Sequence, residues 1–192
     1  SILGVMDWFA WQCWFAVACS FNLASLGMAS DTNQASAEAD RLQRWEDLAS
    51  AAGVCRVPYD SLQTRSVSGP LRILAAHIPN IVATKRTSKE FTVQKPGPFW
   101  TSKPFEKDAF HFGKAPEEEV IGYLGDDRIL INISPCGYGH ALLVPSEAAG
   151  LPQVMTEAAV GAAMRWVAAS RPDFRAFYNS LSAWSSVNHL HI

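Results

Sequence analysis

Two histidines near the end of the sequence have types and a spacing that could do chemistry. His189 and His191 are two residues apart in VNHLHI, and alternate side chains of a β-strand lie on the same face. A histidine nitrogen can attack a phosphorus atom, which divides a nucleotidyl transfer into two displacements through a phosphoramidate. A second histidine on that face can orient the first or stabilise charge on phosphate oxygens. The spacing alone is a weak signal, because an isolated pair is more often an ordinary polar strand face.

The elements expected to position this pair lie where apolar runs and turn residues are most clearly separated in the sequence. Residues 128–134 and 140–145 predict the two strands of a β-hairpin around the turn residues SPCGYG. A helix is expected over 156–170, with Thr156 as its N-cap and Pro172 at its end. FRAFYNS and SVNHLHI then predict two more strands. This order predicts an α+β fold, with an antiparallel sheet and a helix packed on one face.

Weaker signals precede the hairpin. A helix is expected over 39–52, where Leu42, Trp45 and Leu48 form one apolar stripe. A short strand is expected over 71–76. Residues 84–114 carry prolines and lysines with little periodicity and predict an extended loop.

The amino-terminal segment is strongly apolar. Between residues 1 and 30 the only charged side chain is Asp7, and about 20 apolar residues suffice to cross a bilayer as a helix. A membrane-spanning helix over residues 2–28 is therefore expected. A buried hydrophobic helix and the remnant of a targeting peptide are the alternatives. The predicted organisation is a hydrophobic segment over 1–30 and a domain over 31–192.

Composition excludes several classes of function. The formal net charge is -2, which indicates no nucleic-acid partner. The four cysteines form no CxxC pair, so the sequence predicts neither a zinc site nor a disulfide framework. No metal and no cofactor are expected.

Motifs around the histidines carry a resemblance to a known family. INISPCGYGHALLVP and FRAFYNSLSAWSSVNHLHI, in this order around one helix, are similar to the histidine-triad superfamily. More narrowly, they resemble the GDP-L-galactose and GDP-D-glucose phosphorylases. The resemblance runs from about Arg41 to Ile192 and covers only the amino-terminal part of that family. The implied fold is a partial histidine-triad-like antiparallel sheet with a packed helix.

The resemblance also implies roles for individual residues. His191 would be the nucleophile that attacks the α-phosphorus, with His189 beside it. The residues implied to contact the nucleotide and its phosphates are Asn179, Ser180, Ser185, Ser186, His140, Lys85 and Arg86.

Several positions depart from the family pattern. Ala76, Ile78 and Ile81 stand in a stretch where relatives carry polar residues, and a nucleotide loses hydrogen-bond partners there. Gly137 replaces a glutamate, while Phe177 and Ser182 replace glycines beside the phosphate-binding turn. Added side chains hinder the close approach of a backbone to phosphate. These departures point away from a working nucleotide site.

Two functions follow as expectations. The favoured one is a non-catalytic accessory subunit of a membrane protein complex, whose partners are other subunits and lipid. Analogy alone suggests an energy-transducing membrane of a plastid or mitochondrion. The alternative is an incomplete record of an active GDP-hexose phosphorylase, a cytoplasmic nucleotidyltransferase that binds a guanine nucleotide-sugar and forms a covalent His–GMP intermediate. The chain as given is predicted to lack this activity.

Overall fold

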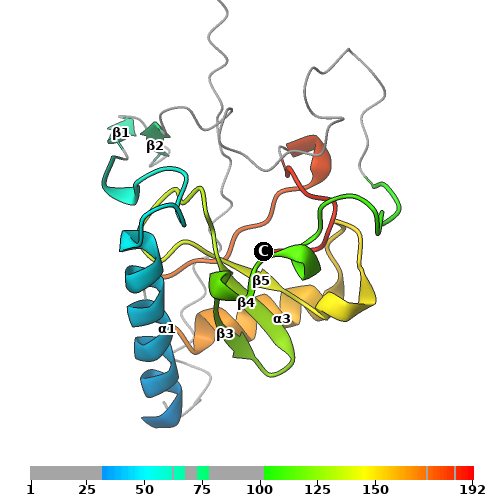
Figure 1. The fold of residues 1–192 in the computed structure, drawn as a ribbon, viewed down its shortest axis with the longest axis horizontal. Helices are drawn as coiled ribbons and strands as arrows, with labels where there is room; N and C mark the ends of the chain where they lie inside the picture. Colours follow the sequence, from blue (N-terminus) through cyan, green and yellow to red (C-terminus); the bar gives the residue numbers. More distant parts are fainter. Residues whose placement is uncertain (1–31, 62, 68–72, 78–101, 172, 184) are drawn as a thin grey trace, which may run out of the picture.

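The computed structural model describes residues 32–61, 63–67, 73–77, 102–171, 173–183 and 185–192 (Figure 1). The apolar segment expected over 2–28 lies outside these residues, as do Ile78, Ile81, Lys85 and Arg86. Among the described helices, none combines the length and apolar character that a membrane span requires.

A three-stranded antiparallel sheet forms the centre of the described fold. Its strands are β3 (Val120–Leu124), β4 (Asp127–Ile131) and β5 (Ala141–Val144), in the order β3-β4-β5. The register places Ile129 opposite Leu143 and Ile131 opposite Ala141. The expected β4–β5 hairpin is confirmed, whereas β3 was not predicted.

Strand β4 ends three residues earlier than the sequence predicts. The side-chain oxygen of Asn132 accepts a hydrogen bond from the Ser134 N–H over 3.0 Å. This local bond is an Asx-turn, which competes with a continued strand.

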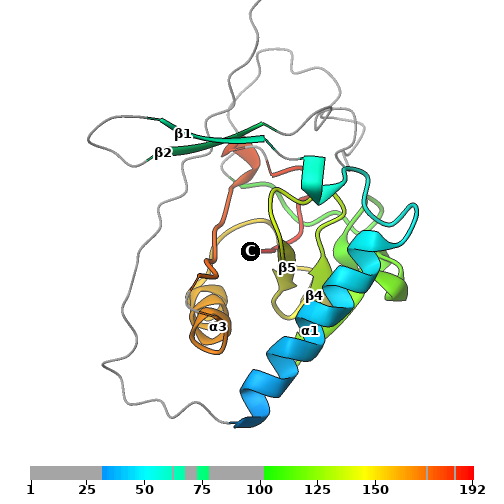
Figure 2. The same ribbon diagram turned by 90° about the vertical axis from the view of Figure 1, so that its left-hand side faces the viewer.

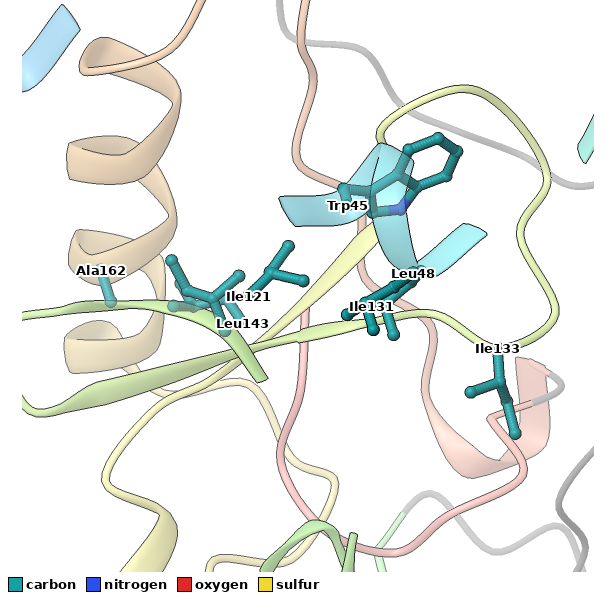
Figure 3. Close-up of a cluster of buried hydrophobic side chains, with 8 residues drawn as sticks. Trp45, Leu48, Ile121, Ile131, Ile133, Leu143 and Ala162 are labelled. Atoms are coloured by element: carbon teal, nitrogen blue, oxygen red, sulfur yellow. The ribbon is translucent and has the colours of Figure 1, made fainter. Parts of the chain in front are cut away.

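Two α-helices contribute to a core with this sheet (Figure 2). Helix α1 (Thr32–Ser50) begins seven residues before the predicted start, and α3 (Glu157–Ala168) follows the predicted N-cap. The Thr156 hydroxyl accepts from the Ala159 N–H over 3.1 Å, which satisfies a donor that the helix leaves unpaired. Figure 3 shows side chains of this cluster, which comprises Trp45, Leu48, Ile121, Ile129, Ile131, Ile133, Leu143 and Ala162.

The second face of the sheet is covered as well. Phe112, at the start of the short 3-10 turn η4 (Phe112–Lys114), packs with Leu130, Val144 and Val187. Consecutive residues of β4 are therefore buried on opposite faces.

The last residues run beside β5 instead of forming a regular strand. Leu143 and Ile192 exchange two main-chain N–H···O bonds of 3.0 Å each, the pattern of an antiparallel pair. Leu190 and Ile192 pack against Ala159 and Ala163 of α3. The last segment was expected to pair with the sheet, and it does so at the Leu143–Ile192 pair.

The prediction of a strand over FRAFYNS is wrong. Residues 174–180 have an irregular backbone. Two of their main-chain carbonyls accept hydrogen bonds from side chains instead of from a neighbouring strand. The Asn179 carbonyl, for example, accepts from the Gln153 side chain over 3.0 Å.

A separate two-stranded antiparallel sheet consists of β1 (Gln63–Val67) and β2 (Ile73–His77). Strand β2 corresponds to the strand expected over 71–76, whereas β1 was not predicted. Ala76, which the family resemblance placed where a polar residue was expected, lies in β2 opposite Thr64.

Candidate functional site

The two histidine rings of the last segment lie on the same side of the chain. Both pack against Phe112, with ring centroids 5.9 Å away for His189 and 4.8 Å away for His191. Leu190 and Ile192 instead pack against α3. This alternation confirms the expectation that the two imidazoles share one face.

The ring of His191 is held in one tautomer by its own chain. Its Nδ1 lies 2.7 Å from the main-chain oxygen of His189. A carbonyl oxygen can only accept, so Nδ1 carries the proton and donates it. The lone pair of a neutral ring is then on Nε2. Attack on a phosphorus atom requires such a lone pair on a ring nitrogen.

His189 has a different environment from His191. Its side chain is buried, with 1% exposed. Nδ1 accepts from the Phe112 N–H over 3.1 Å, and Nε2 lies 3.3 Å from the Glu147 carbonyl oxygen, to which it donates. Burial lowers the pKa of His189. Main-chain groups thus occupy both ring nitrogens, and His189 orients His191 through its carbonyl oxygen.

His140 supplies a third imidazole next to the pair. The Cys136 N–H donates to its Nδ1 over 2.9 Å, and the Asn132 amide nitrogen lies 3.1 Å from its Nε2. Protonating Nδ1 would break the bond from Cys136. Burial, and secondly the nearby His191, lower the pKa of His140 to about 4. His140 is therefore neutral at physiological pH.

Distant parts of the chain position the loop that carries His140. The Trp45 indole N–H donates to the His140 carbonyl over 3.0 Å. Gly139 has φ +70, and a Cβ there would lie 2.7 Å from the Phe174 ring. The Phe177 ring lies 5.3 Å from that of His140, centroid to centroid. Helix α1 and residues 174–177 thus enclose this loop.

The residues expected to contact phosphate form a compact turn. The Ser180 carbonyl accepts from the N–H groups of Ala183 (2.9 Å) and Ser185 (3.0 Å). The Asn179 amide donates to the Ala183 carbonyl over 3.1 Å. Gln153 bonds to both Asn179 and His191, so the structure links this turn to the histidine segment.

The adjacent residues Ser185 and Ser186 differ in accessibility. Ser185 is buried and its hydroxyl donates to the Val187 carbonyl over 3.1 Å. Ser186 is partly exposed. Of the two hydroxyls, that of Ser186 is the one that a phosphate could reach without breaking the turn.

Gln153 is a site residue that the sequence did not indicate. It is fully buried, and its Oε1 accepts from the His191 N–H over 2.9 Å. Its Nε2 donates to the carbonyl oxygens of His191 and Asn179, both over 3.0 Å. A lone glutamine in an irregular segment has neither a periodic pattern nor a motif, so only its three-dimensional contacts reveal it.

A cavity of about 310 Å³ borders His140 and Ile192. Its walls are largely apolar and include the aromatic side chains of Tyr138, Trp166, Phe174 and Phe177. Such walls suit an apolar or planar group.

Within the described ranges, no group of three metal-binding side chains could hold an ion.

Comparison with known proteins decides the family. The model of the family described as "GDPGP1-like, N-terminal domain" matches residues 40–192. The chain belongs to the GDP-hexose phosphorylase family. GDP-D-glucose phosphorylase 1 of Danio rerio is 33% identical over 146 residues, which cover 73% of this chain and 40% of that relative. GDP-L-galactose phosphorylase 2 of Arabidopsis thaliana is 30% identical over 171 residues, covering 77% of this chain and 38% of that relative.

A shorter match, with a higher identity, is to a human protein of the GDP-hexose phosphorylase family. GDP-D-glucose phosphorylase 1 of Homo sapiens is 46% identical over 101 residues, covering 46% of this chain and 26% of that relative. The chain spans about 40% of the length of the first two relatives. Among solved structures, none matches the chain.

Proposed function

We propose that this chain carries the nucleophilic histidine of a GDP-hexose phosphorylase, and that this residue is His191. The observation that carries the proposal is the 2.7 Å bond from Nδ1 of His191 to the His189 carbonyl. This bond directs the lone pair of the neutral ring to Nε2. The family relationship and the names of the relatives supply the substrate class, a guanosine diphosphate linked to a hexose.

The proposed reaction consists of two displacements at the α-phosphorus. In the first, Nε2 of His191 forms a bond to phosphorus, and the bond to the oxygen that bridges to the β-phosphate breaks. Hexose 1-phosphate leaves with that electron pair, and GMP remains on the histidine. In the second, an oxygen of inorganic phosphate attacks the same phosphorus, the N–P bond breaks, and GDP is released.

The surroundings of His191 favour the charged intermediate. Positive charge develops on the ring when Nε2 bonds to phosphorus. The Nδ1–H···O bond to the His189 carbonyl then becomes charge-assisted and stronger. A neutral His140 adds no second positive charge that would oppose this change.

Phosphate contacts in this proposal come from the turn next to the histidine segment. Asn179, Ser180 and Ser186 supply amide and hydroxyl groups on that turn, and Ser185 shapes it. Lys85 and Arg86 are proposed to pair with the pyrophosphate, as the family resemblance implies.

A second candidate function is the non-catalytic accessory subunit of a membrane complex. One observation favours it. The ring of Phe177, at a position where the family resemblance implies a glycine, packs against His140. The bordering cavity has mainly apolar walls and would then hold an apolar group of a partner subunit. The apolar residues 2–28 would attach the protein to the membrane.

A turnover assay separates the two functions. The intact protein is incubated with GDP-D-glucose or GDP-L-galactose, with and without inorganic phosphate, and GDP is measured by chromatography. With phosphate present, we expect GDP and hexose 1-phosphate in equal amounts over many turnovers; without phosphate, we expect no GDP and at most one hexose 1-phosphate per protein molecule. His191→Ala should abolish the reaction, and the exposed helix variant Gln43→Ala should retain it. Absence of turnover in the wild-type protein would overturn the proposal and favour the second candidate.

A further inference from the structure

Gln153 has an unusual position for a polar side chain. It lies in the irregular segment between β5 and α3, and none of its surface is exposed. Burying an amide is costly unless its groups are hydrogen-bonded. Here both Nε2 hydrogens are used, on the carbonyls of His191 and Asn179, and Oε1 accepts from the His191 N–H.

The side-chain amide of Gln153 does for His191 what a neighbouring strand would do. In an extended chain, the N–H and C=O of one residue point toward the same edge. Those of Ile192 pair with Leu143 of β5. Those of His191 both pair with the amide of Gln153. The main chain that carries the imidazole is therefore held from both edges.

Gln153 is itself fixed in place by its own main chain. Its N–H donates to the Asn188 side-chain oxygen over 3.0 Å, and its carbonyl accepts from the Tyr178 hydroxyl over 2.9 Å. The residue therefore bridges the 178–179 segment and the 188–191 segment.

We propose that Gln153 is the positioning residue of the nucleophile. By fixing the N–H and C=O of His191 it fixes where Nε2 points. Through the Asn179 carbonyl it sets the distance between the imidazole and the turn at Ser180. The catalytic part of this inference rests on the proposed function. Its physical basis is that a reacting group must be held to about 0.5 Å, and a displacement of about 1 Å can cost about 100-fold in rate.

The variant Gln153→Glu tests the role directly. It keeps the length and the accepting Oε1, but it replaces the donating amide by an oxygen that faces two carbonyl oxygens. The control is Gln43→Glu, the same change on the exposed face of α1, where the Gln43 amide donates to the Asp47 side chain over 3.0 Å. In the intact protein, Gln153→Glu should lower kcat by about 100-fold with little change in KM. An unchanged kcat, or an effect confined to KM, would overturn the proposal.

A spectroscopic readout separates this inference from the proposed function. Nitrogen NMR of His191 should show one tautomer, protonated on Nδ1, in the wild type and in Gln43→Glu. Gln153→Glu should show a mixture of tautomers. If the wild-type protein turns over no substrate, the proposed function fails while this measurement still decides the positioning role. A single unchanged tautomer in Gln153→Glu would refute it.

Amide hydrogen exchange on the wild-type protein covers the case in which Gln153→Glu does not fold. The His191 N–H should exchange as slowly as the Ile192 N–H, which is paired with Leu143. Fast exchange at His191 beside slow exchange at Ile192 would refute the positioning role without any variant.

Discussion

Trp45 and His140 are joined by a 3.0 Å hydrogen bond from the indole N–H to the main-chain carbonyl. The two residues are separated by 95 positions in the sequence, and the bond ties helix α1 to a loop of the candidate site. Trp45 is fully buried, and its ring also packs edge-on against Tyr59 and Tyr138. One side chain thus supports both the core and the loop.

Trp45→Phe should lower the free energy of unfolding by about 2 kcal/mol, from one lost hydrogen bond and a partly filled cavity. The His140 carbonyl keeps a second partner in the Asn132 N–H, which limits the loss. Urea unfolding measures the change. Tyr123→Phe, on an exposed ring, is the control and should cost less than about 0.5 kcal/mol. Equal losses in the two variants would contradict the role assigned to Trp45.

The stability of the protein should depend on pH through His140. The pKa of His140 is about 4 in the folded protein and 6.5 without its surroundings. Between these values the unfolded chain binds a proton that the folded chain does not, so stability rises with pH across this window. The contribution is fully present above 6.5 and is lost toward pH 4.

A proton NMR titration of the histidine rings tests this dependence, with urea unfolding at about pH 7 and about pH 4.5 alongside it. The His140 ring should stay neutral to about pH 4, and its contribution to the loss of stability should not exceed about 3 kcal/mol. His140→Gln should flatten the dependence. Titration of His140 near its ordinary value would contradict the environment described for it.

A buried arginine near the site, Arg128, pairs with two glutamates whose exposure differs, so the two can be compared. Arg128 bonds to Glu147 over 3.1 Å and to Glu117 over 2.7 Å. Glu117 is 73% exposed, whereas Glu147 is 25% exposed. Glu147→Gln should cost about 2 kcal/mol, because a partly buried charge pair is broken. Glu117→Gln should cost less than about 1 kcal/mol. Urea unfolding giving the reverse order would be inconsistent with this burial.

The order of residues along the chain predicted those elements that depend on interactions between sequence neighbours. The β4–β5 hairpin consists of two short apolar runs on either side of turn residues, and Thr156 precedes α3 as an N-cap. Both could therefore be read from neighbouring residues. The same reasoning extended β4 to Ser134, because it did not include the side-chain bond that Asn132 makes to the backbone.

Long-range contacts determine what the sequence could not predict. FRAFYNS has the composition of a strand, yet Tyr178 and Asn179 bond to Gln153 instead of a neighbouring strand. The shared face of His189 and His191 was predictable from spacing. The family resemblance implied which of the two would react. The different surroundings of the two rings could not be predicted, because those of His189 depend on Phe112 and Glu147, which are far away in sequence.

The claim that Nε2 of His191 forms a covalent bond to the α-phosphorus can be tested by trapping that bond. The intact protein is mixed with a GDP-hexose carrying radioactive phosphorus at the α position, without inorganic phosphate, and the denatured protein is mapped by mass spectrometry. We expect an acid-labile GMP adduct on His191, absent in His191→Ala, retained in Gln43→Glu, and released as labelled GDP when phosphate is added. A wild-type protein without label, or a label that persists in His191→Ala, would contradict the claim.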